Sequence, residues 1–263
     1  MPGTTLRAAL GLIPRRRPGT LPDLELADRG VTADRERLAA YDRVCGFRLS
    51  DRLPATYPHV LAFPLSMRLL TDPAFPFPAI GLVHIANTIT LRRPIDAGER
   101  LDLAVRPAHL RPHDRGRQFD IVASARSGDE TVWESVSTYL SRSRNSGTSS
   151  TGKEREPPVS TATWHVPARV GIGYAAVSGD RNPIHTSRLG ARLFGFPRTI
   201  AHGMWSKARC LAALENRLPE AYTVDVRFKQ PILLPATVHF AYDGDRFDLF
   251  GKRPHLAGHV TPA

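Results

Sequence analysis

The sequence predicts an α+β protein in which one design, a long apolar helix beside several antiparallel strands, occurs twice. Three observations predict it: a polar segment near the middle of the chain, a weak repeat on its two sides, and matching helix and strand patterns in both halves. The chain has 263 residues, of which 41% are hydrophobic and 23% charged. This is enough to bury a core in one large domain or two small ones.

A polar segment separates the two halves. Residues 141–163 hold mostly Ser, Thr, Gly, Pro and charged side chains and no aromatic one, a composition typical of a flexible connection. We therefore expect an N-terminal domain with an N-terminal arm over residues 1–140, a flexible linker over 141–163 and a C-terminal domain over 164–263.

The halves resemble each other in three blocks that follow the same order. Tyr41–Gly46 (YDRVCG) resembles Tyr174–Gly179 (YAAVSG), and Pro58–Leu61 matches Ala201–Met204 at the start of an apolar run. An alternating segment that closes in Arg-Pro-Ile or Gln-Pro-Ile follows in each half. No block is convincing alone, but their common order favours duplication.

Each half supplies one helix and several strands. In the second half, apolar residues at helical spacing over 204–218 predict a helix that ends at Pro219. Alternating patterns predict strands over 223–228, 237–242, 246–250 and 255–261. In the first half an apolar run predicts the matching helix, and the strands are expected over 81–91, 101–107, 118–124 and 132–140.

The chain carries a net charge of +11, spread along both halves. A solvated basic surface without a specific partner explains this charge well. Among partners, a phosphorylated small-molecule carrier or an acidic carrier protein ranks above nucleic acid, because the sequence has no zinc-finger spacing and no RNA-binding aromatic signature. No run nears the roughly 20 apolar residues that span a bilayer, and two cysteines cannot build a disulfide framework. We expect a soluble, cytoplasmic protein without membrane insertion.

The most informative segment is Tyr174–His185, YAAVSGDRNPIH. Asn182 followed by Pro183 predicts a helix start, because Asn caps a first turn and Pro suits the first helical position. Asp180 and His185 then lie at one helix mouth, where they can act as an acid–base pair. The alternative is that Asp180 and Asn182 only cap the helix and that His185 is a surface residue.

A second candidate is His202-Gly203-Met204 at the start of the long apolar helix. Free N–H groups at a helix N-terminus suit an oxygen that gains negative charge, and glycine lets a substrate approach the backbone closely. The alternative is that Gly203 only permits tight helix packing.

Together, YAAVSGDRNPIH and the later HGM resemble the hydratase motif of the MaoC-like family of (R)-specific enoyl-thioester hydratases and 3-hydroxyacyl-thioester dehydratases. The match is specific over about residues 174–232 and looser elsewhere. The degenerate first half and the chain length resemble the double-hotdog members that act in fatty-acid metabolism. The resemblance implies a tandem hotdog, each half an antiparallel sheet around a long helix. It also implies a lyase that reversibly dehydrates (3R)-hydroxyacyl thioesters to trans-2-enoyl thioesters.

The resemblance further implies a role for each motif residue. Asp180 and His185 would hold the water and share the general acid and base roles, and which of them takes the α-proton stays open. Asn182 would orient the pair, and the Gly203 N–H would bind the thioester carbonyl oxygen. The motif residues expected to contact the substrate are Ser178, His202 and Met204. No metal and no cofactor is implied.

The first half lacks this chemistry. The places of Asp180, Asn182 and His185 hold Phe47, Leu49 and Arg52. The first half is also shorter between its repeat blocks, with no room for the helix that carries the motif. We hypothesise that this deletion opens a tunnel for a long acyl chain, and ordinary core packing is an equal alternative. The expected substrate contacts are Phe63, Leu65 and Met67, with Leu61, Phe75 and Phe77 nearby.

Two other functions stay open from the sequence. One is a hotdog thioesterase that hydrolyses the same substrates, and the other is a non-catalytic acyl-thioester binding protein that kept the motif as architecture. The sequence also does not decide between CoA and acyl carrier protein, the acyl chain length or the direction of the reaction. Monomer and homodimer are both compatible with two hotdogs fused in one chain.

Overall fold

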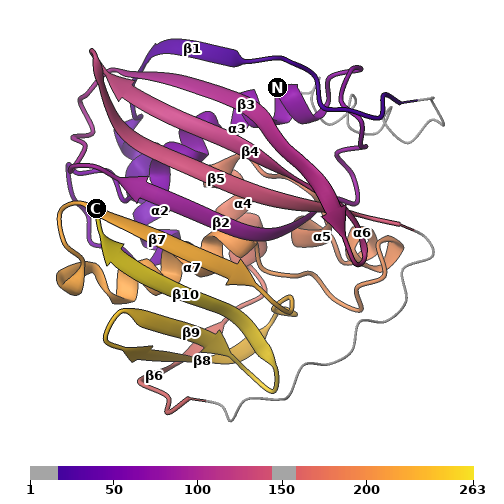
Figure 1. Ribbon diagram of the computed structural model, residues 1–263. Helices are drawn as coiled ribbons and strands as arrows, with labels where there is room; N and C mark the ends of the chain where they lie inside the picture. The colour runs from indigo at the N-terminus through magenta and orange to yellow at the C-terminus, as the bar shows by residue number, and fades with distance from the viewer. Residues whose placement is uncertain (1–16, 144–157) are drawn as a thin grey trace.

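The computed structural model describes residues 17–143 and 158–263 (Figure 1). These residues form one ten-stranded antiparallel sheet that covers the helices on one side. The strand order is β1-β3-β4-β5-β2-β7-β10-β9-β8-β6. The strands are β1 (Leu26–Val31), β2 (Val83–Leu91), β3 (Leu101–His113), β4 (Gly116–Ser127), β5 (Glu130–Arg142), β6 (Ala162–Val166), β7 (Tyr222–Phe228), β8 (Ala236–Asp243), β9 (Arg246–Phe250) and β10 (Pro254–Pro262). The predicted α+β class is confirmed.

The helices divide between the halves as the repeat predicts, with one long apolar helix in each. They are α2 (Arg35–Cys45), α3 (Tyr57–Leu70), α4 (Val170–Ser178), α5 (Pro183–Thr186), α6 (Arg188–Leu193) and α7 (Gly203–Ala213). α7 is shorter than predicted, because Leu214 N–H donates to the Leu211 carbonyl and the chain tightens into a 3-10 turn at Glu215–Arg217. Within the described residues, no helix has the length and apolar character needed to cross a membrane.

The halves join edge to edge at the centre of the sheet. β2 pairs antiparallel with β7, and the Thr88 hydroxyl donates to the Asp225 carboxylate over 2.6 Å at this seam. The ends of the expected linker belong to strands, because β5 pairs with β4 as far as Arg142 and β6 pairs with β8 from Ala162. Residues 144–157 of that linker and residues 1–16 of the expected arm lie outside the described residues.

The repeat is visible in the backbone. α2 and α4 end on glycines with left-handed conformations, Gly46 at φ 86° and Gly179 at φ 84°. This conformation favours glycine because a Cβ would clash with the backbone there. The first pair of repeat blocks therefore forms the same helix end twice.

The second pair of repeat blocks, Pro58–Leu61 and Ala201–Met204, does not align as predicted. Leu53 N–H donates to a carbonyl at the end of its Arg-Pro-Ile block, and Ala201 N–H makes the same bond in the second half. Ala201 therefore matches Leu53, and the predicted match of His202 with His59 is wrong. Likewise the isolated bridge of Arg52 resembles that of Ile200, so Arg52 does not stand in the place of His185. The longer second-half segment in between forms α5 and α6, which have no counterpart in the described first half.

A buried polar network lies behind the seam. Lys207 of α7 is fully buried, and its Nζ donates to the Asn87 carbonyl, to Asn87 Oδ1 and to the Val224 carbonyl over 3.0, 2.6 and 3.1 Å. Asn87 Nδ2 donates in turn to the hydroxyls of Ser135 and Ser137. Burial holds the pKa of Lys207 well below its usual range. The network fastens the second-half helix to the first-half strands.

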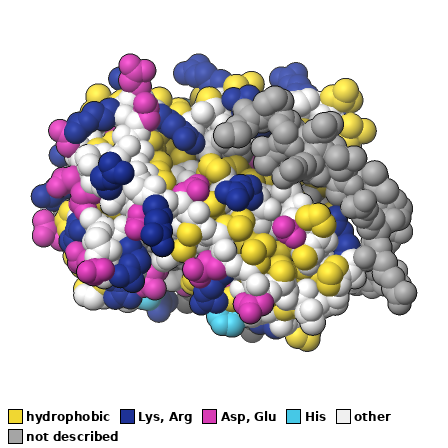
Figure 2. Space-filling model, turned by 90° about the horizontal axis from the view of Figure 1, so that it is seen from above, with side chains coloured by type: hydrophobic (Ala, Val, Ile, Leu, Met, Phe, Trp, Pro, Cys, Tyr) yellow, Lys and Arg dark blue, Asp and Glu magenta, His cyan; other side chains and the backbone are white. Residues whose placement is uncertain are grey.

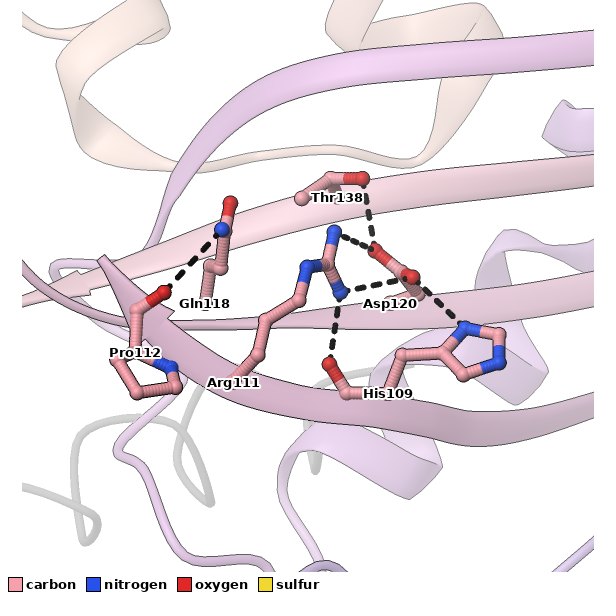
Figure 3. Close-up of polar contacts among 6 residues, drawn as sticks. All are labelled: His109, Arg111, Pro112, Gln118, Asp120 and Thr138. Carbon is pink, nitrogen blue, oxygen red and sulfur yellow. Dashed lines mark hydrogen bonds and ion pairs between the residues drawn. The ribbon is translucent and has the colours of Figure 1, made fainter.

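A second polar cluster fixes an irregularity between β3 and β4 (Figure 3). His109 has a positive φ of 50°. Arg111, two residues later, donates two hydrogen bonds of 2.9 and 3.1 Å to the buried Asp120 carboxylate. The Thr138 hydroxyl donates to the same carboxylate over 2.7 Å. Asp120 lies between Phe119 and Ile121, which are buried in the core, so its side chain is on the opposite face of the sheet. The cluster is remote from the inner face.

Charges are mixed over the surface seen in Figure 2, where basic and acidic side chains alternate instead of gathering by sign. On this face the positive excess is dispersed, as the sequence predicts.

Candidate active site

The segment after α4 is shaped by its own polar side chains. At Gly179 the chain turns out of the helix, and Asp180 N–H donates to the Ser178 hydroxyl over 3.2 Å. Asp180 Oδ1 accepts from Asn182 N–H, and Asn182 Oδ1 accepts from Ile184 N–H to cap α5. The carboxylate of Asp180 is thereby held at the mouth of α5, with its side chain 32% exposed.

His185 lies on α5 with its ring fixed from one side. Its Nδ1–H donates to the Ile200 carbonyl over 2.8 Å, which makes Nε2 the nitrogen with the free lone pair. Ile200 N–H donates back to the Ile184 carbonyl over 3.1 Å, so two chain segments hold the ring. Burial lowers the pKa of His185, and the Asp180 charge opposes this shift. At neutral pH the imidazole is therefore neutral.

His202 packs against His185 and the backbone of Asp180. Its ring stacks on the His185 ring at 3.6 Å between centroids, and its Nε2–H donates to the Asp180 main-chain carbonyl over 3.0 Å. The ring is buried, and burial together with the adjacent His185 lowers its pKa to about 3. His202 thus contacts both His185 and the backbone of Asp180 while it stays uncharged itself.

Gly203 begins α7 directly after His202. As the first residue of the helix, its N–H has no carbonyl partner within α7 and can bind an oxygen acceptor. A Cβ added at Gly203 would lie 3.1 Å from the Phe228 ring, closer than ordinary contact. A side chain at position 203 would therefore require the aromatic ring or the helix start to shift by a few tenths of an ångström.

The three polar side chains form one compact group. One ligand-type atom from each of Asp180, His185 and His202 lies within 4.8 Å of the others. The two rings are stacked, and one nitrogen of each ring is already bound to a backbone carbonyl. The arrangement suits proton transfer between a carboxylate and an imidazole better than it suits a metal ion.

The inner face of the sheet forms the wall near this group. His84 of β2 stacks on Tyr139 of β5 at 4.7 Å and contacts Phe228 of β7 at 5.0 Å. His59 of α3 stacks on His84 at 6.4 Å. Burial lowers the pKa of His59 to about 4 and that of His84 to about 3. Neutral, half-buried rings from both halves therefore line the region between Gly203 and α3.

Comparison with known proteins identifies the family of the chain. A family model described as a MaoC-like domain matches residues 149–248. The 3-hydroxyacyl-thioester dehydratase X of Mycobacterium tuberculosis is 41% identical over 249 residues, which cover 91% of this chain and 88% of that protein. The chain belongs to the MaoC-like dehydratase family. The predicted lyase class is confirmed with it.

Solved structures of MaoC-like and related proteins identify the fold. The crystal structure of HtdX from Mycobacterium tuberculosis has a TM-score of 0.81 and 37% identity, and covers 91% of this chain and 100% of that chain. A further Mycobacterium tuberculosis protein with a double hotdog fold has a TM-score of 0.50 and 12% identity, and covers 92% of this chain and 96% of that chain. The predicted tandem hotdog is confirmed.

The structure brings several residues of the MaoC-like motif together and sets others apart. Asp180, Asn182 and His185 lie together as described, and Gly203 follows His202, which stacks on His185. Ser178 is buried and binds the backbone of Asp180, so it positions the carboxylate. The core encloses Met204 and Leu65, and it also holds Phe75 and Phe77, which pack on Phe119. Met67 packs against the core, whereas Phe63 lies 3.6 Å from the Cβ position of Gly179, beside the site.

Sequence reasoning missed the wall residues His59, His84, Tyr139 and Phe228, and it missed that His202 acts through its neighbours. Alternation along β5 was a usable signal for Tyr139, because it places this residue on the same sheet face as Trp133. In β2 a register shift between His84 and Ala86 brings His84 to the face of Ile89 and Leu91, and alternation alone would have placed it on the opposite face. Which strands are adjacent is not encoded in that alternation.

Proposed function

We propose that this chain catalyses the reversible dehydration of (3R)-hydroxyacyl thioesters to trans-2-enoyl thioesters. One arrangement supports the proposal above all. Ligand-type atoms of Asp180 and His185 lie within 4.8 Å of each other, and Gly203, with an N–H that has no partner within α7, begins the helix that follows His202. The kinship with a dehydratase of 3-hydroxyacyl thioesters supports the same reaction.

Dehydration requires two proton movements and one stabilised oxygen. The α-proton becomes removable when a hydrogen bond from Gly203 N–H stabilises the negative charge on the thioester carbonyl oxygen. The C3 hydroxyl leaves as water when it receives a proton. Asp180 and His185 supply the base and the acid, and water returns along the same path in the hydration direction.

The surroundings of Asp180 and His185 suit an acid–base pair. A neutral His185 can accept a proton at Nε2, and its Nδ1–H remains bound to the Ile200 carbonyl throughout. The Asp180 side chain is partly exposed, so substrate and water can reach it from solvent. On the other side it is covered by the buried His202. No cofactor takes part in the proposed reaction. CoA and acyl carrier protein are both compatible carriers, and a cytoplasmic location is part of the proposal.

Turnover of crotonyl-CoA by Asp180→Asn and His185→Gln tests these roles. Loss of a general acid or base lowers kcat by about 10²- to 10⁴-fold, and we expect each variant to fall in that range. The reaction is followed by the loss of the enoyl-thioester absorbance, and free thiol is measured in parallel.

Two exposed residues provide matched controls. Asp129→Asn in the β4–β5 turn and His165→Gln on β6 change the same chemical groups away from the site, and both are expected to keep full activity. Release of thiol without hydration would instead assign a thioesterase. Folded Asp180→Asn and His185→Gln variants with unchanged turnover would refute the assigned roles.

A further inference from the structure

The short helix α6 carries an unusual amount of exposed apolar surface. The side chains of Leu189, Leu193 and Phe194 are 69%, 78% and 39% exposed. Leu189 and Leu193 are four residues apart on α6 and therefore share one face of the helix. Neither lies in the core cluster of the described residues.

Arginines border this apolar surface. Arg181, Arg188, Arg192 and Arg198 are all exposed, and residues 181–214 contain no Asp or Glu. None of the four forms a salt bridge within the described residues, although Arg198 donates to the Pro235 carbonyl. We name Leu189, Leu193, Phe194 and these four arginines the α6 patch.

The α6 patch is rigidly attached to the catalytic segment. The Ser187 hydroxyl caps α6 through Gly190 N–H, and a Cβ added at Gly190 would lie 2.5 Å from the Pro183 side chain. α6 therefore packs closely on α5, which carries His185. Both helices lie at one end of the sheet, in the chain segment that the first half lacks (Figure 1).

We propose that the α6 patch is the docking surface for an acidic carrier protein that presents the acyl thioester. This inference rests on the proposed function and specifies its partner. Exposed arginines attract an anionic protein surface and raise the association rate, and exposed leucines supply the apolar contact that stabilises a bound protein helix. The phosphates of CoA would use the arginines but would leave the leucines without a role.

Two other occupants fit the patch less well. In a two-fold contact with a second copy of this chain, the patch would meet itself and bring like charges together. A membrane-surface helix uses a long amphipathic segment, whereas α6 has six residues.

The test compares one acyl group on two carriers. Hydration of crotonyl-CoA and of the same crotonyl group on an acyl carrier protein is measured for the full chain and for two double variants, Leu189→Ser with Leu193→Ser and Arg188→Glu with Arg192→Glu. We expect KM for the carrier-protein substrate to rise by about tenfold or more in both, since exposed contact residues at interface centres dominate such affinities. For crotonyl-CoA the Leu variant is expected to match the unaltered chain within about twofold, because the leucines contribute only to protein docking.

Matched controls change the same residue types elsewhere. Leu49→Ser replaces a 61% exposed leucine of the first half, and Arg253→Glu replaces an exposed arginine in the β9–β10 turn. Neither should alter KM for either substrate.

Each contrary outcome is distinct. An unchanged KM for the carrier-protein substrate in the Leu variant, or an equal loss for both substrates, overturns the docking surface. Conversion of a dimer to a monomer by the Leu variant, seen by light scattering, assigns the patch to a second copy. Loss of binding to anionic phospholipid vesicles, with KM unchanged, assigns it to a membrane. If the unaltered chain hydrates neither thioester, the proposed function itself fails.

Discussion

At the residue scale, the site combines side chains that the sequence could identify with one whose role it could not. Local chemistry made Asp180, Asn182 and His185 candidates, because an Asn-Pro start sets the backbone within a few residues, and the resemblance to the MaoC-like motif gave them their expected roles. The role of His202 depends on how α7 meets the loop after α4. Only the folded chain places its ring on His185 and its Nε2–H on the Asp180 carbonyl.

Replacement of His202 tests its positioning role. His202→Phe keeps a flat ring against His185 but removes the donor to the Asp180 carbonyl, and a buried acceptor without its partner costs about 1–3 kcal/mol. We expect kcat to fall about tenfold with little change in KM, because the reacting residues lose their alignment.

The pH profile separates positioning from proton transfer. The pKa of His202 is about 3, so His202 does not titrate near neutral pH, and His202→Phe should leave the shape of the kcat–pH profile unchanged. Disappearance of one limb of that profile would make His202 a proton donor or acceptor instead.

At the scale of the elements, the two long apolar helices α3 and α7 and eight of the ten strands of the described residues follow the sequence pattern, whereas β1, β6, α2 and α4 were not predicted. Alternation identified those eight strands, but β3 continues to His113 because β4 pairs with it beyond the predicted end at residue 107. α6 has six residues, too few for a helical period to be recognised, and Ser187 starts it by capping Gly190.

A substitution at the start of α7 tests the proposal that the Gly203 N–H binds the thioester oxygen. Gly203→Ala places a Cβ 3.1 Å from the Phe228 ring, and the ring or the helix start must shift. We expect kcat/KM to fall about 10- to 100-fold, as when an oxyanion donor is displaced, with only a small change in the melting temperature.

A second substitution checks the cause. Phe228→Leu makes room for the added methyl group, so Gly203→Ala combined with Phe228→Leu should regain activity relative to Gly203→Ala alone. Equal losses in the single and the double variant would show that the Phe228 contact is not what makes glycine necessary.

At the scale of the whole molecule, the two halves of the chain share one sheet but contribute different parts of the site. The second half supplies the proposed acid–base pair, and the first half contributes the wall of His59, His84 and Tyr139. The sequence predicted the duplication, but the pairing of β2 with β7 joins residues far apart in the chain, and no local pattern encodes it. The buried link from Lys207 to Asn87 depends on that pairing.

The neutral histidines of the wall make stability depend on pH. The folded-state pKa of His84 is about 3, below the unfolded value near 6.5. Its contribution is complete above pH 6.5 and is lost as the pH falls, because the unfolded chain then binds a proton that the folded chain does not. Removing this histidine should therefore flatten the loss of stability in acid.

Urea unfolding of His84→Phe between pH 7 and 4 measures this effect. A phenyl ring fits the stack with Tyr139 and Phe228, and the free energy of unfolding should fall less steeply than in the unaltered chain, by up to about 1.4 kcal/mol per pH unit. The exposed His165→Phe is the control, with the slope of the unaltered chain. Parallel slopes for His84→Phe and the unaltered chain would show that His84 is not held neutral.

The central claim is that Asp180 and His185 act on opposite ends of one carbon–carbon bond while Gly203 holds the thioester oxygen. Hydration of crotonyl-CoA in deuterium oxide tests it most directly, with the product resolved by chiral chromatography and mass spectrometry. The account predicts (3R)-3-hydroxybutyryl-CoA with a single deuterium on C2. A (3S) product, or cleavage of the thioester without addition of water to the double bond, would contradict it.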